Sequence, residues 1–298
     1  MKKIYFYLIA VAGACLFAFA GCNKEEPIPA YVHIDKISLV ANPSGFANSV
    51  TGDEGSLSSK ITDAWVYVDE QLVGCFELPV TFPVLAEGVH SVRIRAGIKV
   101  NGISATRSPY PFYDSYVENV NFQPNTRITL SPTVKYLTNT TFAWMENFES
   151  GGNSLDSSHY NNDTGVLLTN NSCVTTPQNV YEGCASGFVH IGAGGRFECV
   201  SNASYVMPRA GAPVFLEFNY RCNGGVAVAM YTSSASGGSQ VPALYLNPSA
   251  DWNKAYVYLS TVIGENGTAT DFTISLGMSN LTGTDSLGLL LDNIKLVY

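Results

Sequence analysis

VFLEFNYR, residues 214–221, decides the fold of this 298-residue chain. Apolar side chains recur at every second position from Val214 to Tyr220, and charged or amide side chains fill most of the positions between them. A period of two residues is typical of a β-strand whose two faces meet different surroundings. The segment therefore predicts a strand with one face in a hydrophobic core.

Short runs of the same kind recur along the chain, separated by turn residues such as Gly and Pro. They lie at residues 64–69, 89–96, 226–231, 255–259, 272–278 and 287–298. Strands at this spacing, without a convincing helical period, predict β-sandwiches. We therefore expect an all-β chain of two β-sandwich domains, residues 31–136 and 137–298, divided at the polar break 137–140.

The composition favours an extracellular protein. Charged residues make up 13% of the chain, about half the usual share, and the formal net charge is −8. Hydroxyl and amide side chains take the place of the missing charges, as in extracellular β-structure. An acidic balance without a basic cluster argues against nucleic acid as a partner.

The first 30 residues predict export and lipid anchoring. The basic start Met1-Lys2-Lys3 precedes an uncharged apolar run, residues 4–20, which ends at Gly21-Cys22. This order is typical of a secretory signal, here residues 1–21, and it makes Cys22 the predicted lipidation site at the head of a tether, residues 22–30. The alternative is an uncleaved anchor, since 17 apolar residues are at the lower limit for spanning a bilayer.

The sequence around Cys22 resembles a bacterial lipobox, with Phe19 where leucine is usual. Lys24-Glu25-Glu26 resembles the surface-export signal of Bacteroidota-type lipoproteins. The resemblance implies diacylglycerol and palmitate on Cys22, which would hold the protein in the outer membrane and expose it on the cell surface.

Residues 66–92 resemble PEGA-type domains, which share the pattern V-x-V-D-G…G…P…L…G-x-H-x-V. The chain has Val66-Tyr67-Val68-Asp69 at the start and Gly88-Val89-His90 near the end, but Glu70 replaces the turn glycine. The resemblance implies an immunoglobulin-like sandwich that acts as a spacer or interaction module. His90 would then be a structural residue.

The second half resembles the jelly-roll sandwiches of carbohydrate-binding and galactose-binding-like modules. The resemblance lies in its opening segment, residues 146–151, and its closing strand, residues 290–296. In such modules an opening Glu and a closing Asp often share a structural calcium ion, which implies Glu149 and Asp292 as ligands, with Glu146 as a weaker third. The alternative is that Asp292 accepts backbone hydrogen bonds at a β-bulge.

Two rows of polar and aromatic side chains are the predicted ligand-binding surface. One row follows residues 217–221, and a second follows residues 254–258. Aromatic rings stack on sugar C–H faces while polar groups bind the hydroxyls, so such a face suits a glycan. The alternative is a solvated outer face. The predicted binding residues are Glu217, Asn219, Arg221, Trp252, Tyr256 and Tyr258, with Lys254 in the second row and Tyr231 and Tyr245 as further aromatic candidates.

Four late cysteines allow one or two disulfides in an oxidising setting. They are Cys173, Cys184, Cys199 and Cys222, and the sequence leaves their pairing open. The alternative is that some are buried thiols that act as small hydrophobic residues.

The sequence carries no catalytic signature. Its four histidines form no H-E-x-x-H motif, and it has no G-x-S-x-G elbow. We therefore expect a protein that is not an enzyme: its second domain would bind an extracellular glycan. The alternative is a structural or adhesive surface lipoprotein that binds other proteins.

Overall fold

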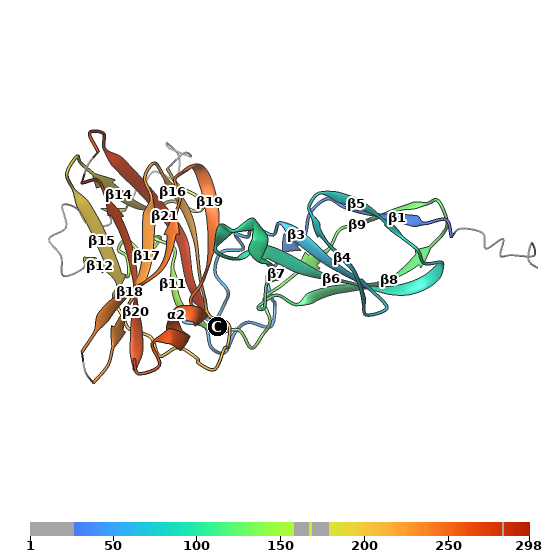
Figure 1. The fold of residues 1–298 in the computed structure, drawn as a ribbon, viewed down its shortest axis with the longest axis horizontal. Helices are drawn as coiled ribbons and strands as arrows, with labels where there is room; N and C mark the ends of the chain where they lie inside the picture. Colours follow the sequence, from blue (N-terminus) through green and yellow to red (C-terminus); the bar gives the residue numbers. More distant parts are fainter. Residues whose placement is uncertain (1–26, 158–166, 169–178, 236, 282) are drawn as a thin grey trace, which may run out of the picture.

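The structure is a computed structural model that describes the chain except for residues 1–26, 158–166, 169–178, 236 and 282. The predicted signal peptide, Cys22 and Cys173 therefore lie outside the described residues. Figure 1 shows two β-sandwiches placed end to end, with the C-terminus between them. No helix in the described part of the chain is long and apolar enough to cross a membrane.

The first sandwich packs two sheets face to face. One sheet has the order β5 (Val80–Val84), β1 (Ala30–Ile34), β9 (Arg127–Leu130). The other has the order β4 (Gln71–Glu77), β3 (Asp63–Val68), β6 (Gly88–Lys99), β7 (Arg107–Pro109), and β8 (Ser115–Phe122) also pairs with β6. A short ribbon of β2 (Ser38–Leu39) and β10 (Thr133–Val134) completes this half. Val32, Val66 and Ile94 lie in its core. Their side chains point inward because successive side chains of a strand point to opposite faces.

The turn between β3 and β4 explains the predicted structural role of His90. Asp69 and Glu70 have φ angles of 47° and 64°, the left-handed pair that a two-residue hairpin turn requires. The Asp69 carboxylate accepts the Ser91 N–H at 3.0 Å and lies 2.6 Å from His90 Nδ1. His90 thus ties the turn to β6.

The second sandwich packs two larger sheets. We call the first the junction sheet: β13 (Leu167–Leu168), β14 (Gly187–Ile191), β21 (Leu287–Val297), β16 (Phe215–Cys222) and β19 (Ser249–Tyr258), with β11 (Phe142–Glu146) beside β21. The second is the distal sheet: β12 (Leu155–Ser157), β15 (Arg196–Ser201), β20 (Asp271–Ser279), β17 (Val226–Ser233) and β18 (Ser239–Leu246). Helix α2 (Ser260–Glu265) follows β19.

The strand predicted at residues 214–221 is β16, shifted by one residue. Leu216, Phe218 and Tyr220 lie in the core between the junction and distal sheets. The opposite side of β16 faces the first sandwich, where Phe215 packs against Tyr110 with ring centroids 5.2 Å apart. The all-β prediction is confirmed.

The chain passes from the first sandwich to the second between β10, which ends at Val134, and β11, which begins at Phe142. That the two groups are domains with a boundary at residue 137 stays a prediction.

The late cysteines that the structure describes include one in a disulfide and two buried thiols. Cys184 is disulfide-bonded, whereas Cys199 and Cys222 are free and buried. Cys199 and Cys222 therefore act as small hydrophobic residues of the second core, and a double disulfide among the four late cysteines does not form.

Candidate functional site

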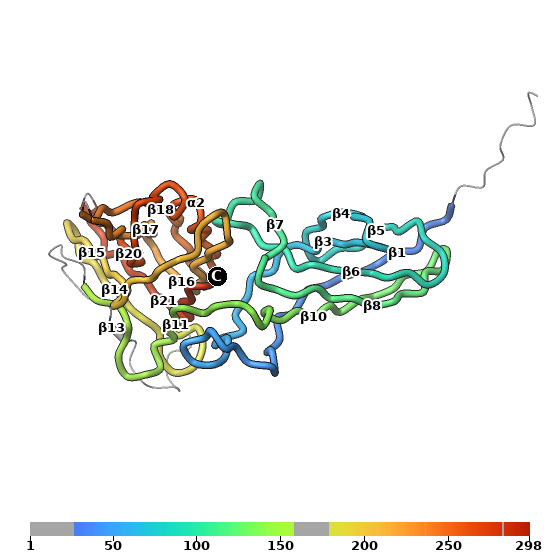
Figure 2. The backbone as a smooth tube through the Cα atoms, turned by 90° about the horizontal axis from the view of Figure 1, so that it is seen from below, coloured from blue at the N-terminus to red at the C-terminus, as the bar shows by residue number. Residues whose placement is uncertain are grey.

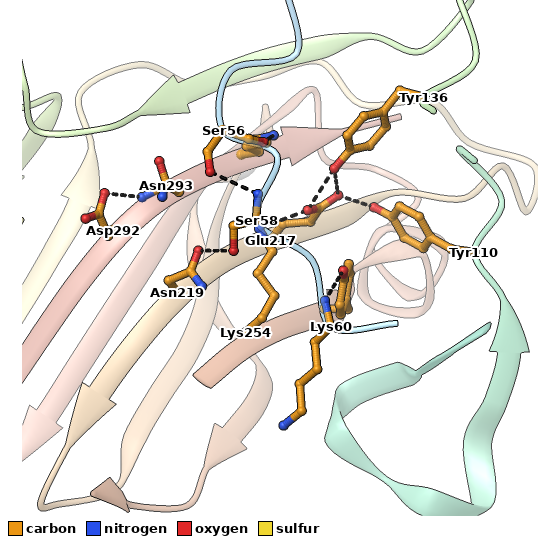
Figure 3. Close-up of polar contacts among 12 residues, drawn as sticks. Ser56, Ser58, Lys60, Tyr110, Tyr136, Glu217, Asn219, Lys254, Asp292 and Asn293 are labelled. Carbon is orange, nitrogen blue, oxygen red and sulfur yellow. Dashed lines mark hydrogen bonds and ion pairs between the residues drawn. The ribbon is translucent and has the colours of Figure 1, made fainter. Parts of the chain in front are cut away.

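The predicted ligand-binding row on β16 is buried between the two sandwiches. Glu217 and Asn219 are 0% and 1% exposed. Glu217 Oε1 accepts hydrogen bonds from the hydroxyls of Tyr110 at 2.5 Å and Tyr136 at 3.0 Å, both from the first half. Lys254 on the neighbouring strand β19 places its Nζ 3.2 Å from Glu217 Oε2. Figure 3 shows both tyrosines directed at this carboxylate.

A segment of the first half, residues 49–60, lies over the same face of the junction sheet. We call it the strap. Ser58 Oγ donates to Asn219 Oδ1 at 2.8 Å (Figure 3). The Lys60 N–H donates to the Tyr256 hydroxyl at 3.0 Å. Tyr256 is 3% exposed. The expectation of an open sheet face is therefore wrong for Glu217, Asn219 and Tyr256, because partners from the first half cover them.

The remaining predicted binding residues, Arg221, Trp252 and Tyr258, are half-buried. Tyr258 packs on Phe215 at 5.2 Å between ring centroids, and Trp252 packs on Tyr181 at 5.4 Å. Arg221 donates to Asn179 Oδ1 at 3.0 Å. The structure thus places the six predicted residues on the neighbouring strands β16 and β19 and does not gather them around one ligand-sized hollow.

The predicted calcium ligands are bound by N–H and O–H donors. Glu149 Oε1 accepts the backbone N–H groups of Cys184 at 2.8 Å and Ala185 at 2.9 Å. Asp292 Oδ2 accepts the Ser186 hydroxyl at 2.6 Å, and Asp292 Oδ1 accepts the Asn293 N–H at 2.8 Å. Glu146, the weaker third candidate, accepts the N–H groups of Phe148 and Ser154, both at 2.6 Å.

A calcium ion needs six to eight oxygen ligands, and calcium at Glu149 and Asp292 stays a prediction. Among the residues that the structure describes, no group of three or more His, Cys, Asp or Glu side chains is arranged to hold a metal. Asn293 has a φ of 48° beside a register shift between β16 and β21. The contacts therefore favour the alternative, in which Asp292 sits at a β-bulge. Burial raises the pKa of Asp292 to about 6, against the lowering effect of its hydrogen bonds.

The outer face of the distal sheet carries a site that the sequence did not reveal. Four residues in register cross four adjacent strands: Glu198 on β15 faces Gly277 on β20, Gly277 faces Ala227 on β17, and Ala227 faces Tyr245 on β18. Neighbouring strands lie about 4.8 Å apart, so the row is about 14 Å long. A carboxylate stands at one end and an aromatic ring at the other.

Small residues make the middle of this row hollow. Ala227 and Gly277 form the floor of a cavity of about 540 Å³, and its walls include Arg196, Glu198, Gln240 and Tyr245. Tyr245 is 66% exposed. A Cβ added at Gly225 would lie 2.0 Å from the Tyr245 hydroxyl, so the phenol end of the ring lies over a glycine that has no side chain to displace it. We call this cavity the distal hollow.

Hydrogen bonds fix the acidic end of the distal hollow. Glu198 Oε1 accepts the hydroxyls of Ser275 at 2.7 Å and Tyr231 at 3.0 Å, and it also accepts the Gln240 amide. These three donors come from β20, β17 and β18, so the carboxylate is held across the width of the sheet. Strand alternation places Glu198 outward because its neighbours Phe197 and Cys199 are buried in the core.

Sequence reasoning named the aromatic residues of this site but missed the rest. The sequence identifies Tyr231 and Tyr245 as aromatic candidates. The alternation in residues 196–201 was a signal that could have directed attention to Glu198. Gly277 and Ala227 carry no signal by themselves, because their importance comes from the register of their strands.

No known protein family and no curated protein matches this sequence. Solved structures that resemble it include carbohydrate-binding modules of the β-sandwich superfamily. A module from a study of promiscuous specificity shares 13% identity over 91% of this chain and 99% of its own, with a TM-score of 0.38.

Two further structures cover about half of this chain. A CBM61 module in complex with β-1,4-galactotriose shares 14% identity over 51% of this chain and 93% of its own, with a TM-score of 0.33. A CBM22 xylan-binding domain from Paenibacillus barcinonensis shares 14% identity over 51% and 91%, with a TM-score of 0.36. At these identities and scores, the similarity identifies neither a ligand nor a binding residue in this chain.

Proposed function

We propose that this protein binds a saccharide without catalysis, and that the distal hollow is its binding site. The row from Glu198 through Gly277 and Ala227 to Tyr245 is the observation that carries the proposal. An exposed tyrosine ring offers a face on which a sugar ring stacks, and its hydroxyl end remains polar. The small residues between the two ends leave room for the sugar, and the fixed carboxylate accepts hydrogen bonds from its hydroxyls.

The distal hollow offers both kinds of contact that a sugar makes, polar groups for its hydroxyls and apolar surface for its C–H faces. Its lining combines the polar residues Arg196, Glu198, Gln240 and Ser279 with Tyr245 and with the apolar residues Phe197, Met278 and Leu281. Sites for small molecules are lined mainly by hydrophobic and aromatic side chains, with a few polar groups that fix the orientation of the ligand. A ligand with many hydroxyls matches the polar groups present here.

The proposed location is the outer face of the outer membrane, with acyl chains on Cys22 as the anchor. Two acyl chains or more give stable attachment, whereas one gives only marginal binding. Residues 23–30 reach at most roughly 25 Å from the membrane. Figure 2 shows that β1 begins at the end of the first sandwich that lies away from the second. This arrangement supports a first half that acts as a spacer and a distal hollow that faces outward.

A glycan array with the soluble chain from residue 23 tests the proposal. We expect binding to one or more glycans, and we expect Tyr245→Ala to weaken it at least tenfold. Tyr31→Ala is the matched control, because Tyr31 is also exposed, at 39%, but lies in the first sandwich. The proposal is wrong if no glycan binds, or if both variants bind as well as the unchanged protein. Recovery of a surface protein complex in place of a glycan would favour the adhesive alternative.

A further inference from the structure

A second hollow lies on the outer face of the junction sheet, and all of its lining residues belong to the second half of the chain. Its volume is about 280 Å³. Leu289 and Leu291 of β21 lie in the core, so Gly288 and Leu290 point to the outer face. The first half covers this face at Asn219, whereas the hollow lies where β16 ends and β21 begins. We call it the Gly288 hollow.

Gly288 opens the middle of this hollow because it has no side chain. On one side it lies opposite His190 of β14. On the other side its N–H donates to Asn223 Oδ1 at 2.6 Å, and the Asn223 N–H donates to the Gly288 carbonyl oxygen at 3.3 Å. A Cβ added at Gly288 would have its nearest contact at 3.9 Å, to the Val189 carbonyl oxygen. A side chain would therefore fit at this position and fill the hollow.

One wall of the Gly288 hollow combines apolar surface with a cation. Phe188 of β14, Leu290 of β21 and Arg221 of β16 stand in register across three adjacent strands. Neighbouring strands lie about 4.8 Å apart, so this row is about 10 Å long. Phe188 is partly exposed, and Leu290 is 5% exposed. The aromatic ring and the aliphatic side chain beside it offer a surface on which the C–H face of a sugar can pack.

Arg221 and Asn223 supply polar contacts beside this wall. Among the described residues that line the hollow, Arg221 is the one charged residue. Its guanidinium carries five donors, so it can bind Asn179 Oδ1, at 3.0 Å, together with a ligand. Asn223 is exposed, and its amide donates to the Ser286 carbonyl oxygen at 3.1 Å and accepts the Gly288 N–H. An amide has two donors and two lone pairs, so one of each remains for a ligand.

We propose that the Gly288 hollow is a second saccharide site, which binds one sugar unit between Phe188, Arg221 and Asn223. The proposal rests on the proposed saccharide binding for the class of its ligand, but it uses different residues on the opposite sheet. The volume of 280 Å³, against 540 Å³ for the distal hollow, is near the lower end of the range for ligand pockets, so it suits a single unit of a glycan. Two sites on opposite sheets would allow one molecule to bind two glycan segments, which raises its avidity for polymers.

NMR with single sugars tests this site without a polymer. Methyl glycosides of glucose, galactose, mannose and xylose are titrated separately, at millimolar concentrations, into the ¹⁵N-labelled soluble chain. We expect saturable shifts of the Gly288 and Asn223 amide signals with at least one glycoside, and we expect Phe188→Leu to weaken that binding at least tenfold. Phe76→Leu is the matched control, because Phe76 is also partly exposed but lies in the first sandwich. Tyr245→Ala should leave the shifts unchanged, since Tyr245 lies on the distal sheet.

The outcomes separate this site from the distal hollow. The second site is wrong if no glycoside gives a saturable shift at Gly288 and Asn223, or if Phe188→Leu and Gly288→Val leave the Asn223 shift unchanged. Gly152→Val is the control for Gly288→Val, since a Cβ at Gly152 meets nothing within 4 Å. If the second site fails while array glycans still bind through Tyr245, the proposed function holds. If the shifts occur but array binding does not depend on Tyr245, the distal hollow is wrong and the second site stands.

Discussion

Gly277 lies directly opposite Ala227 across the pair of strands β20 and β17, and these two residues form the floor of the distal hollow. They are the two middle residues of a row that has Glu198 at one end and Tyr245 at the other. A strand pair at the centre of a sheet normally carries side chains that fill such a space. The absence of bulk at these two positions is therefore what gives a flat sheet a ligand-sized recess.

Lys254→Met should destabilise the protein by about 3–5 kcal/mol, the usual effect of removing one member of a buried ion pair. The change leaves Glu217 buried with two tyrosine hydroxyls but without its ion-pair partner. Urea unfolding measures the loss. The double variant Glu217→Gln/Lys254→Met should recover most of it, because the glutamine keeps an acceptor for Tyr110 and Tyr136. A loss below about 1 kcal/mol for Lys254→Met would show that the interface does not depend on this pair.

Asp292 should make the protein less stable as the pH rises from about 4 to about 6. Its pKa is about 6 in the folded state because burial disfavours the charged form, whereas an unfolded aspartate titrates near 3.9. The unfolded state loses its proton first, so ionisation costs the folded state roughly 3 kcal/mol once the pH exceeds 6.

Urea unfolding between pH 4 and pH 7 tests this prediction with Asp292→Asn as the comparison. The difference in free energy of unfolding between the variant and the unchanged protein should grow in favour of the variant as the pH rises. A difference that stays constant over this range would contradict the raised pKa of Asp292.

Chelation should leave the thermal stability unchanged. Glu149 and Asp292 accept N–H and O–H donors from residues 184–186 and from Asn293, so neither carboxylate depends on a cation. Differential scanning calorimetry with EDTA and with added calcium measures the effect. A fall in Tm with EDTA that calcium restores would reinstate the calcium site that the sequence resemblance implied.

Glu70→Gly should stabilise the first sandwich, with a rise in Tm of about 2 °C. Glu70 has a φ of 64°, a conformation that glycine adopts without steric cost. Its bidentate ion pair with Arg93 is lost in the variant, and this loss offsets part of the gain. Glu87→Gly is the control: Glu87 is exposed and lacks a positive φ, so the same change there should lower Tm.

The alternation of apolar and polar residues predicts strand β16, but it does not predict which residues cover the polar face of that strand. The period of two shows that Leu216 and Glu217 face opposite sides. It does not show that the strap, more than 150 residues earlier in the chain, lies over Asn219 on the same face as Glu217. That contact depends on how the two sandwiches meet, and no local pattern carries this information.

The distal hollow was harder to predict for a related reason. Glu198 and Tyr245 are far apart in the chain and meet only through the strand order β15, β20, β17, β18. A shift of one residue in any register would turn one member of the row to the core face. The sequence identifies Tyr245 as an aromatic candidate, but only the paired strands show that it stands across from Glu198.

The affinity of Gly277→Val for a glycan found on the array tests the central claim most directly. A Cβ at Gly277 would have its nearest contact at 3.4 Å, to the Phe197 carbonyl oxygen, so the added side chain fits the strand and fills the hollow. Gly152→Val is the control, because a Cβ at exposed Gly152 meets nothing within 4 Å. Isothermal titration calorimetry should show at least a tenfold loss of affinity for Gly277→Val, about 1.4 kcal/mol or more, at unchanged Tm. Equal affinity of Gly277→Val, Gly152→Val and the unchanged protein would contradict saccharide binding in the distal hollow.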